Sequence, residues 1–334
     1  MKNLPTRKLG KNGPELSALG LGCMGMSPDF YGAVDRAESI ATVHAALEAG
    51  ITLFDTGDFY GMGHNELLLQ EALKGTKREK VFIQVKFGAQ RDPAGNWLGY
   101  NARPQALKTA LAYTLKRLGT DYADLYQPAR LDPAVPIEET VGAIAEMIQA
   151  GYVRYIGLSE MGAATIRRAH NVHPITGLQI EYSLMSRAIE TEILPTVREL
   201  GIGITAYGVL SRGLLASAKG VQNFDPKDFR SRSPRWQGEN LQRNLTLVEA
   251  LEQIANEKKT TPAQLAIAWV LSRGDDILPL VGARTRERLK ESLSALDLEL
   301  GAADFERIEH AVPAAKVAGA RYAEHQMTVL DSER

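Results

Sequence analysis

Three side chains that together can move a proton stand at the ends of two apolar segments. Asp55 and Tyr60 occur in Asp-Thr-Gly-Asp-Phe-Tyr-Gly (55–61), and Lys86 occurs in Val-Phe-Ile-Gln-Val-Lys-Phe-Gly (81–88). A phenol with a pKa of about 10 is a poor proton donor or acceptor at neutral pH, but a buried ammonium nearby favours its phenolate, and a carboxylate can hold that ammonium in place. Strand-end acids and lysines also form ordinary structural ion pairs, so the rest of the chain must decide between the two interpretations.

The elements that must position these residues alternate along the chain. Short apolar runs typical of buried strands are followed by longer segments with helical spacing of apolar residues. Units of this kind with no linker between them predict one closed (β/α)8 TIM barrel and a single domain over residues 1–334. The expected strands are 18–22, 51–54, 81–85, 123–126, 152–158, 177–180, 203–206 and 277–280; the expected helices are 35–49, 66–73, 104–118, 137–150, 163–170, 189–200 and 285–295.

Several segments fall outside this alternation. Residues 6–19, with Lys-Asn-Gly as the turn, predict an N-terminal β-hairpin that closes the bottom of the barrel. Residues 211–239 are poor in apolar residues and predict a long loop, followed by helices at 240–257 and 262–271. The tail from 313 to 334 has no clear period. Because long loops at the C-terminal face of a barrel lie over its site, we expect these segments to contribute there.

Composition limits the classes of function. The chain has 334 residues, 44% of them hydrophobic, and a net charge of −1, so we expect no nucleic-acid partner. Cys23 is the single cysteine, which excludes an internal disulfide and makes a cysteine-based metal site implausible; we expect no metal. No apolar stretch approaches the roughly 20 residues that cross a bilayer, and no apolar leader opens the chain. We therefore expect a cytoplasmic protein without a membrane partner; the oligomeric state is not indicated.

The spacing Asp-x4-Tyr-Gly and the later apolar-Lys-Phe-Gly resemble the catalytic signature of the aldo-keto reductases, NAD(P)H-dependent enzymes on a (β/α)8 barrel. The resemblance extends over nearly the whole chain. It implies that Asp55, Tyr60 and Lys86 are catalytic in the reduction of a small-molecule carbonyl substrate. Tyr60 is then the general acid, and Lys86 and Asp55 tune it electrostatically.

The fourth catalytic residue of that family is missing. The family has a His in Asp-Leu-Tyr-x-x-His-Arg at the end of strand four, where this chain has Ala129 in Asp-Leu-Tyr-Gln-Pro-Ala-Arg (124–130). In the family that imidazole polarises the carbonyl and narrows the pocket. Gln127 and Arg130 are near in sequence, and Gln127 is expected to make a structural hydrogen bond. His64 is expected to start a helix rather than to replace the missing imidazole.

Cofactor binding is predicted in two regions. No Gly-x-Gly-x-x-Gly follows the first strand, which argues against a Rossmann domain. The segment 278–292 instead resembles the family's binding site for the adenosine 2′-phosphate, and a helix start with two arginines suits a phosphate. NADPH is therefore the expected cofactor. The residues predicted to bind it in this segment are Gly282, Arg284, Thr285, Arg288, Glu291 and Ser292.

The nicotinamide end of the cofactor is predicted from other strand ends. By resemblance Ser159 and Gln179 hold the carboxamide, and Tyr207 stacks on the ring. Glu160 replaces the family's Asn, so one amide contact is expected to differ. Further residues predicted to contact the cofactor are Gly22, Met24, Asp55, Gly208, Leu210, Arg212, Gly213 and Leu214.

An apolar cup is expected around the substrate. Phe59, Trp97 and Ala129 are predicted to contact it, together with a wider group of aromatic candidates at the mouth: Phe30, Tyr31, Tyr100 and Trp236. The Pro-Ala-Arg form of strand four is similar to a bacterial branch that reduces pyridoxal or bulky ring ketones, including 3-keto-deoxynivalenol, which would imply a role in detoxification. Two alternatives stay open: a pyridoxal reductase, and a non-catalytic NADPH-binding subunit resembling the potassium-channel β subunits, which also lack the His.

Overall fold

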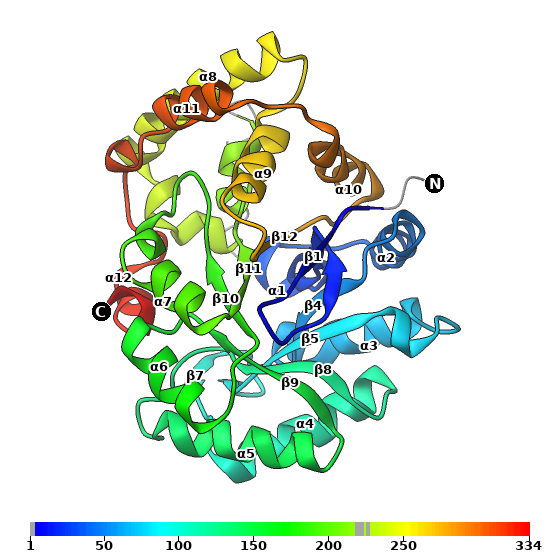
Figure 1. The fold of residues 1–334 in the computed structure, drawn as a ribbon. Helices are drawn as coiled ribbons and strands as arrows, with labels where there is room; N and C mark the ends of the chain where they lie inside the picture. Colours follow the sequence, from blue (N-terminus) through cyan, green and yellow to red (C-terminus); the bar gives the residue numbers. More distant parts are fainter. Residues whose placement is uncertain (1–3, 218–223, 225–227) are drawn as a thin grey trace.

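The structure is a computed structural model and describes residues 4–217, 224 and 228–334. Parallel strands close into a barrel in its centre, which confirms the expected (β/α)8 TIM barrel (Figure 1). Each strand pairs in parallel with the next, and the last pairs with the first. Around the barrel the strands are β3 (Gly20–Gly22), β4 (Leu53–Gly57), β5 (Phe82–Phe87), β8 (Ala123–Pro128), β9 (Val153–Ser159), β10 (Gly177–Glu181), β11 (Gly203–Tyr207) and β12 (Ile277–Val281).

Helices surround the barrel (Figure 1). Their ends follow ordinary capping rules: Thr261 and Gln264 form a reciprocal capping box, and Gly119 ends a helix in the left-handed conformation with φ 64°. Between β11 and β12 lie two helices, α8 (Gly238–Glu257) and α9 (Pro262–Ser272). The others that follow barrel strands are α2 (Arg36–Ala49), α3 (His64–Ala72), α4 (Pro104–Leu118), α5 (Ile137–Gln149), α6 (Ala163–Val172), α7 (Ile193–Leu200) and α10 (Arg286–Leu293).

One predicted helix begins later than expected. Helical spacing predicted residues 189–200, but α7 begins at Ile193, after the 3-10 turn η4 (Ala188–Glu190). Pro195 lies in the first turn of α7, where its missing N–H and fixed φ are tolerated. An earlier start would have placed that proline in the helix interior.

The N-terminal hairpin closes the barrel as expected. β1 (Thr6–Lys8) pairs antiparallel with β2 (Glu15–Ser17). Leu9 and Leu16 are buried in a cluster with barrel leucines such as Leu53. An added side chain at Gly203, the first residue of β11, would lie within 3 Å of Leu9, so the hairpin seals the N-terminal end of the strands.

Other short elements were not anticipated from the sequence. A second hairpin, β6 (Ala89–Arg91) with β7 (Trp97–Tyr100), follows β5 at the C-terminal face. Helix α11 (Ala302–Ala311) follows α10, and the tail contains η9 (Ala314–Lys316), α12 (Glu324–Met327) and η10 (Asp331–Glu333). These tail segments are too short to show a period, which is why the sequence pattern did not reveal them.

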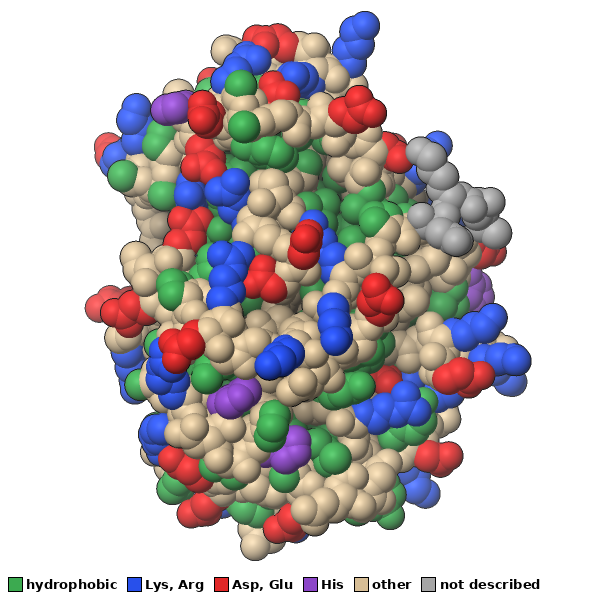
Figure 2. Space-filling model, in the orientation of Figure 1, with side chains coloured by type: hydrophobic (Ala, Val, Ile, Leu, Met, Phe, Trp, Pro, Cys, Tyr) green, Lys and Arg blue, Asp and Glu red, His purple; other side chains and the backbone are tan. Residues whose placement is uncertain are grey.

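The predicted loop at 211–239 is described only in part. It contains η5 (Ser211–Ala216), η6 (Phe229–Arg232) and η7 (Pro234–Trp236), whereas residues 218–223 and 225–227 lie outside the described residues. No helix in the described part of the chain is long and apolar enough to cross a membrane. Acidic and basic side chains are interspersed over the face drawn in Figure 2.

Candidate active site

A buried ion pair lies at the centre of the barrel's C-terminal face. Lys86 Nζ donates to both carboxylate oxygens of Asp55, at 2.6 and 2.7 Å. Gln179 and Gln84 also donate to Asp55 Oδ1, at 2.7 and 3.2 Å. Burial lowers the pKa of Lys86, and Asp55 opposes that effect. The two residues that the sequence placed at neighbouring strand ends therefore meet, and Asp55 is held in one orientation.

Tyr60 lies beside this pair. It follows β4 in the turn η2 (Tyr60–Gly63), in which Gly61 and Met62 have positive φ values of 58° and 54°. The Tyr60 ring is buried, and Lys86 Nζ lies 5.2 Å from its centroid. Burial, followed by the charge of Asp55, raises the pKa of Tyr60 well above its usual value. The sequence argument emphasised the lowering effect of the nearby ammonium, but desolvation dominates, so the phenol stays protonated at neutral pH.

At the end of β8 no imidazole is present. Ala129 is 2% exposed, and its N–H donates to Phe87 O at 2.8 Å. Gln127 Nε2 approaches Gln179 Oε1 at 3.4 Å, a structural contact of the kind expected. His64 opens α3 and its Nδ1 lies 3.0 Å from Ser27 Oγ, in keeping with the expected role at a helix start.

Aromatic side chains extend outward from Tyr60. The Phe30 and Phe59 rings contact it edge-on, with centroids 5.6 and 4.8 Å away. Trp97 continues the series, 6.2 Å from Phe59 and 5.5 Å from Tyr100. Because Trp97 is 47% exposed, this series runs from the buried phenol to the surface and can form one wall of a substrate site.

Two other aromatic candidates have different neighbours. Trp236 is buried and packs against Phe224, with centroids 5.0 Å apart. The carbonyl of Tyr31 accepts a hydrogen bond from Arg284 at 3.1 Å, so Tyr31 lies toward α10.

The residues assigned to the nicotinamide lie at adjoining strand ends. Ser159 pairs in register with Gln179, and its buried Oγ has no hydrogen-bond partner among the described residues. Both ends of the Gln179 amide are engaged, by Asp55 and by Gln127. An unpartnered buried hydroxyl beside Gln179 is suited to an amide such as the nicotinamide carboxamide, so the residues present fit this cofactor.

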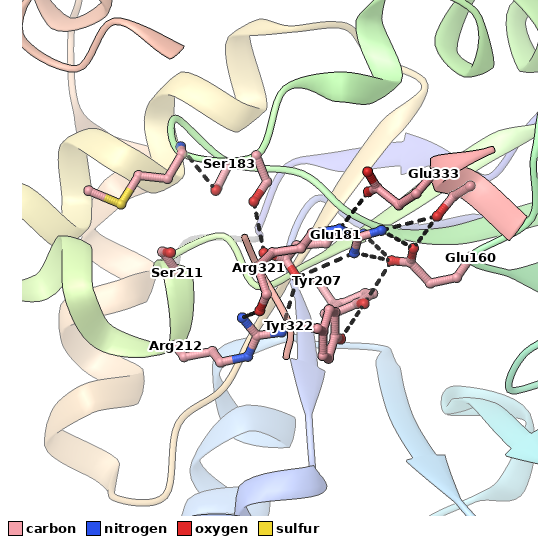
Figure 3. Close-up of polar contacts among 12 residues, drawn as sticks. Glu160, Glu181, Ser183, Tyr207, Ser211, Arg212, Arg321, Tyr322 and Glu333 are labelled. Atoms are coloured by element: carbon pink, nitrogen blue, oxygen red, sulfur yellow. Dashed lines mark hydrogen bonds and ion pairs between the residues drawn. The ribbon is translucent and has the colours of Figure 1, made fainter. Parts of the chain in front are cut away.

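Glu160 occupies the position of the family's Asn and is bound by the C-terminal tail. Arg321 Nη1 donates to Glu160 Oε1 at 2.9 Å, and Ser332 Oγ donates to Oε2 at 2.6 Å (Figure 3). Burial would raise the pKa of Glu160, but Arg321, with smaller contributions from the charge of Arg130 and the hydrogen bond from Ser332, holds the pKa well below its usual range. Glu160 has a positive φ of 55°, an uncommon conformation that this network maintains.

The tail also reaches Tyr207. The Tyr207 phenol donates to Glu160 Oε1 at 2.7 Å and lies 2.8 Å from the Tyr322 phenol oxygen (Figure 3). Arg321 and Tyr322 were not identified from the sequence. The sequence showed only that a Tyr occurs in a tail with no regular spacing of apolar residues. No spacing rule connects that Tyr to a strand end more than a hundred residues earlier.

The loop after β11 carries several of the residues predicted to contact the cofactor. Gly208 and Gly213 have positive φ values of 66° and 96°. Arg212 donates to Glu181 Oε2 at 3.1 Å and to the Arg321 carbonyl at 2.9 Å, so its charge is already compensated. The other residues predicted to contact the cofactor are Leu210 and Leu214 in the same loop, Gly22 at the end of β3, and Met24 just after that strand.

The residues assigned to the 2′-phosphate lie at the start of α10. Thr285 caps that helix by accepting from Arg288 N at 3.3 Å. Arg284 and Arg288 are exposed, and Arg288 forms an ion pair with Glu291 at 2.8 Å. Ser292 Oγ donates to the Arg288 carbonyl, and Gly282 is exposed between β12 and the helix. This surface offers positive charge that a phosphate can reach without displacing buried groups.

Comparisons with known proteins agree with this geometry. The aldo/keto reductase family model matches residues 18–313. The chain is 43% identical to probable aldo-keto reductase 1 of Glycine max, over 94% of this chain and 91% of that protein. A glycerol dehydrogenase of Gluconobacter oxydans superposes with a TM-score of 0.83 at 27% identity, covering 92% of this chain and 96% of that one. The holo form of an aldo-keto reductase of Bacillus halodurans superposes with a TM-score of 0.77 at 27% identity, covering 97% of this chain and 100% of that one.

Proposed function

The chain belongs to the aldo/keto reductase family and is therefore an oxidoreductase; on that premise we propose that it reduces an aldehyde or ketone to an alcohol with NADPH, with Tyr60 as general acid. The observation that carries the proposal is the buried Asp55–Lys86 ion pair with the Tyr60 ring against it. A protonated phenol beside a fixed ammonium suits proton donation to an oxygen that is gaining negative charge.

Each member of this trio has a separate task. Tyr60 gives its phenol proton to the carbonyl oxygen. Lys86 lies over the ring and can stabilise the negative charge that proton loss leaves on the phenol. Asp55 keeps Lys86 charged and in place, and Gln179 fixes Asp55 in turn.

The cofactor preference rests on the start of α10. A bound reduced nicotinamide supplies the hydride for such a reaction. Ser159 offers an unpartnered hydroxyl for its carboxamide, and Tyr207 a ring for stacking. The exposed arginines Arg284 and Arg288 can donate charge-assisted hydrogen bonds to a 2′-phosphate, which supports NADPH over NADH.

The substrate proposal rests on the apolar surface beside Tyr60 and on the small side chain of Ala129. Phe59 and Trp97 form an aromatic wall, and Ala129 has only a methyl group where the family has an imidazole. Both features favour a bulky ring carbonyl, for which 3-keto-deoxynivalenol, and with it a role in detoxification, is our suggestion. Pyridoxal, an aromatic aldehyde, suits the same wall and is the second candidate.

The test is a screen of NADPH oxidation with small aldehydes, pyridoxal and polycyclic ketones. We expect turnover of at least one substrate, and we expect Tyr60→Phe to lower kcat about 100-fold or more while NADPH affinity stays near native, because only the proton donor is lost. NADPH quenching of tryptophan fluorescence measures the affinity. Tight NADPH binding without turnover across the panel would instead indicate a regulatory binding subunit, and near-native kcat in Tyr60→Phe would remove Tyr60 from the mechanism.

A further inference from the structure

The guanidinium of Arg130 lies at the mouth of the site and has no role in the proton relay described above. Arg130 follows β8 directly, and β8 pairs with β5 so that Lys86 is opposite Gln127. Its side chain is turned back over the strand end, because Nη1 donates to the Ala129 carbonyl at 2.6 Å. The Arg130 side chain thus begins next to the position where the imidazole is missing.

Arg130 has donors to spare. A guanidinium carries five N–H groups, and Arg130 uses one in the bond to Ala129 O. A second contact, from Nη2 to the Tyr322 phenol oxygen, is long at 3.4 Å. Arg130 is only half-buried, so its remaining donors are open to a ligand.

The charge of Arg130 is also left without a direct counter-ion. No carboxylate of the described residues lies within ion-pair distance of it, in contrast to the other cations of this cluster. Glu160 is bound by Arg321, and Glu181 by Arg212. A guanidinium with free donors and no ion-pair partner in a partly dry site is expected to bind an oxygen that carries or develops negative charge.

Arg130 lies beside residues of the site, because its guanidinium approaches Tyr322, whose phenol oxygen is 2.8 Å from that of Tyr207. Burial and Asp55 raise the pKa of Tyr60, and Arg130 acts in the opposite direction, so its positive charge is felt at the phenol. Arg130 likewise opposes a positive charge on Lys86. It therefore acts on both residues of the proton relay.

We propose that Arg130 is a catalytic residue that donates a hydrogen bond to the substrate's carbonyl oxygen, in the role left vacant at Ala129. The inference rests on the proposed function. Tyr60 remains the proton donor; Arg130 transfers no proton, since a guanidinium stays protonated at any working pH. Its contribution is to stabilise the negative charge that develops on the oxygen before the phenol proton arrives.

The experiment compares Arg130→Met and Arg130→Gln with the native protein on the best substrate of the screen. Loss of one oxyanion donor typically lowers kcat by about 100-fold or more, and we expect that loss with a smaller change in KM. NADPH affinity, measured by fluorescence, is expected to stay within about twofold. Added guanidinium ion is expected to restore part of the kcat of Arg130→Met, whereas added sodium at equal ionic strength is not.

A binding measurement tests the same donors without turnover. Benzoate presents a planar carboxylate and is expected to inhibit the native protein competitively with the carbonyl substrate, and at least tenfold more weakly in Arg130→Met. Arg154→Met is the matched control: that guanidinium lies at the start of β9, at the other end of the barrel, over the Tyr122 ring at 3.8 Å. We expect its kinetics to match the native protein.

The outcomes separate the two proposals. If the native protein turns over a carbonyl and Arg130→Met retains kcat within about threefold, Arg130 is not the second donor. If Arg130→Met loses NADPH affinity in parallel with activity, Arg130 is a cofactor ligand and this inference is wrong. If Arg130→Met does not fold, Arg130→Gln is judged by the same measurements. Absence of turnover in the native protein would instead refute the proposed function.

Discussion

At the level of single residues, the vacancy at Ala129 has a measurable consequence. Its side chain is 2% exposed, so a larger side chain must displace its neighbours or extend into the proposed substrate site. We expect Ala129→His to lower kcat/KM for a bulky substrate and to affect a small aldehyde less, because the imidazole fills space that the bulky ring needs. The measurement is the bulky-to-small ratio of kcat/KM in both proteins. An unchanged ratio would mean that Ala129 does not border the substrate.

A second prediction for a single residue concerns Asp58 and the dependence of the free energy of unfolding on pH. Burial, with a smaller contribution from Glu66, raises the pKa of Asp58 to about 7, and its Oδ1 has no hydrogen-bond partner among the described residues. An unfolded Asp titrates near 3.9, so the folded protein loses stability as pH rises from about 4 to about 7. Asp58→Asn removes that titration. It should be more stable than the native protein at pH 8 by roughly 2–4 kcal/mol and nearly equal to it at pH 4.

Urea denaturation at the two pH values provides the measurement. The expected signature is a stability difference that grows with pH. A difference of the same size at pH 4 and pH 8 would show that folding does not raise the pKa of Asp58.

At the level of elements, the start of α10 is predicted to bind the cofactor's 2′-phosphate. We expect the Arg284→Ala, Arg288→Ala double variant to weaken NADPH by roughly 2–4 kcal/mol, because hydrogen bonds to charged groups contribute about 1.5–3 kcal/mol each and do not add fully. NADH affinity should change little. Arg286 lies on the same helix, but its Nε and Nη2 both donate to Glu38, whereas Arg288 makes a single contact to Glu291, so Arg286→Ala is the matched control. Equal losses for both cofactors in the double variant would exclude a role in reading the phosphate.

At the level of the whole molecule, the C-terminal tail is joined to the barrel by a buried ion pair. Arg321 contacts Glu160 at the end of β9, and removal of Arg321 leaves the buried Glu160 carboxylate without its ion-pair partner, whereas Arg321 itself also pairs with Glu333 and Glu181. We expect Arg321→Met to lower the free energy of unfolding by about 3–5 kcal/mol, and the double variant Glu160→Gln, Arg321→Met to recover part of that loss. The exposed pair Arg167–Glu199 is the control, and Glu199→Gln should change stability by less than about 1 kcal/mol.

The same pair has a pH signature. The pKa of Glu160 is depressed in the folded protein, so its contribution is fully present above the unfolded value near 4.3 and is lost as pH falls below it. Glu160→Gln should therefore show a weaker loss of stability between pH 5 and pH 3 than the native protein. Identical acid profiles would mean that Glu160 does not stabilise the fold through its charge.

The sequence by itself determined the barrel and the meeting of Asp55 with Lys86. Alternating strand and helix patterns are local signals, and parallel strands bring residues at their C-terminal ends to one face, so strand-end spacing was sufficient. Tertiary structure alone decided that Glu160 binds Arg321, 161 residues further along, and that Arg130 lies near Tyr322, 192 residues away. No period relates a strand end to an irregular tail, because the path of the tail depends on packing and charge compensation in the folded protein. Burial also depends on the tertiary structure. It raises the pKa of the Tyr60 phenol, and the phenol is buried only once the barrel is closed.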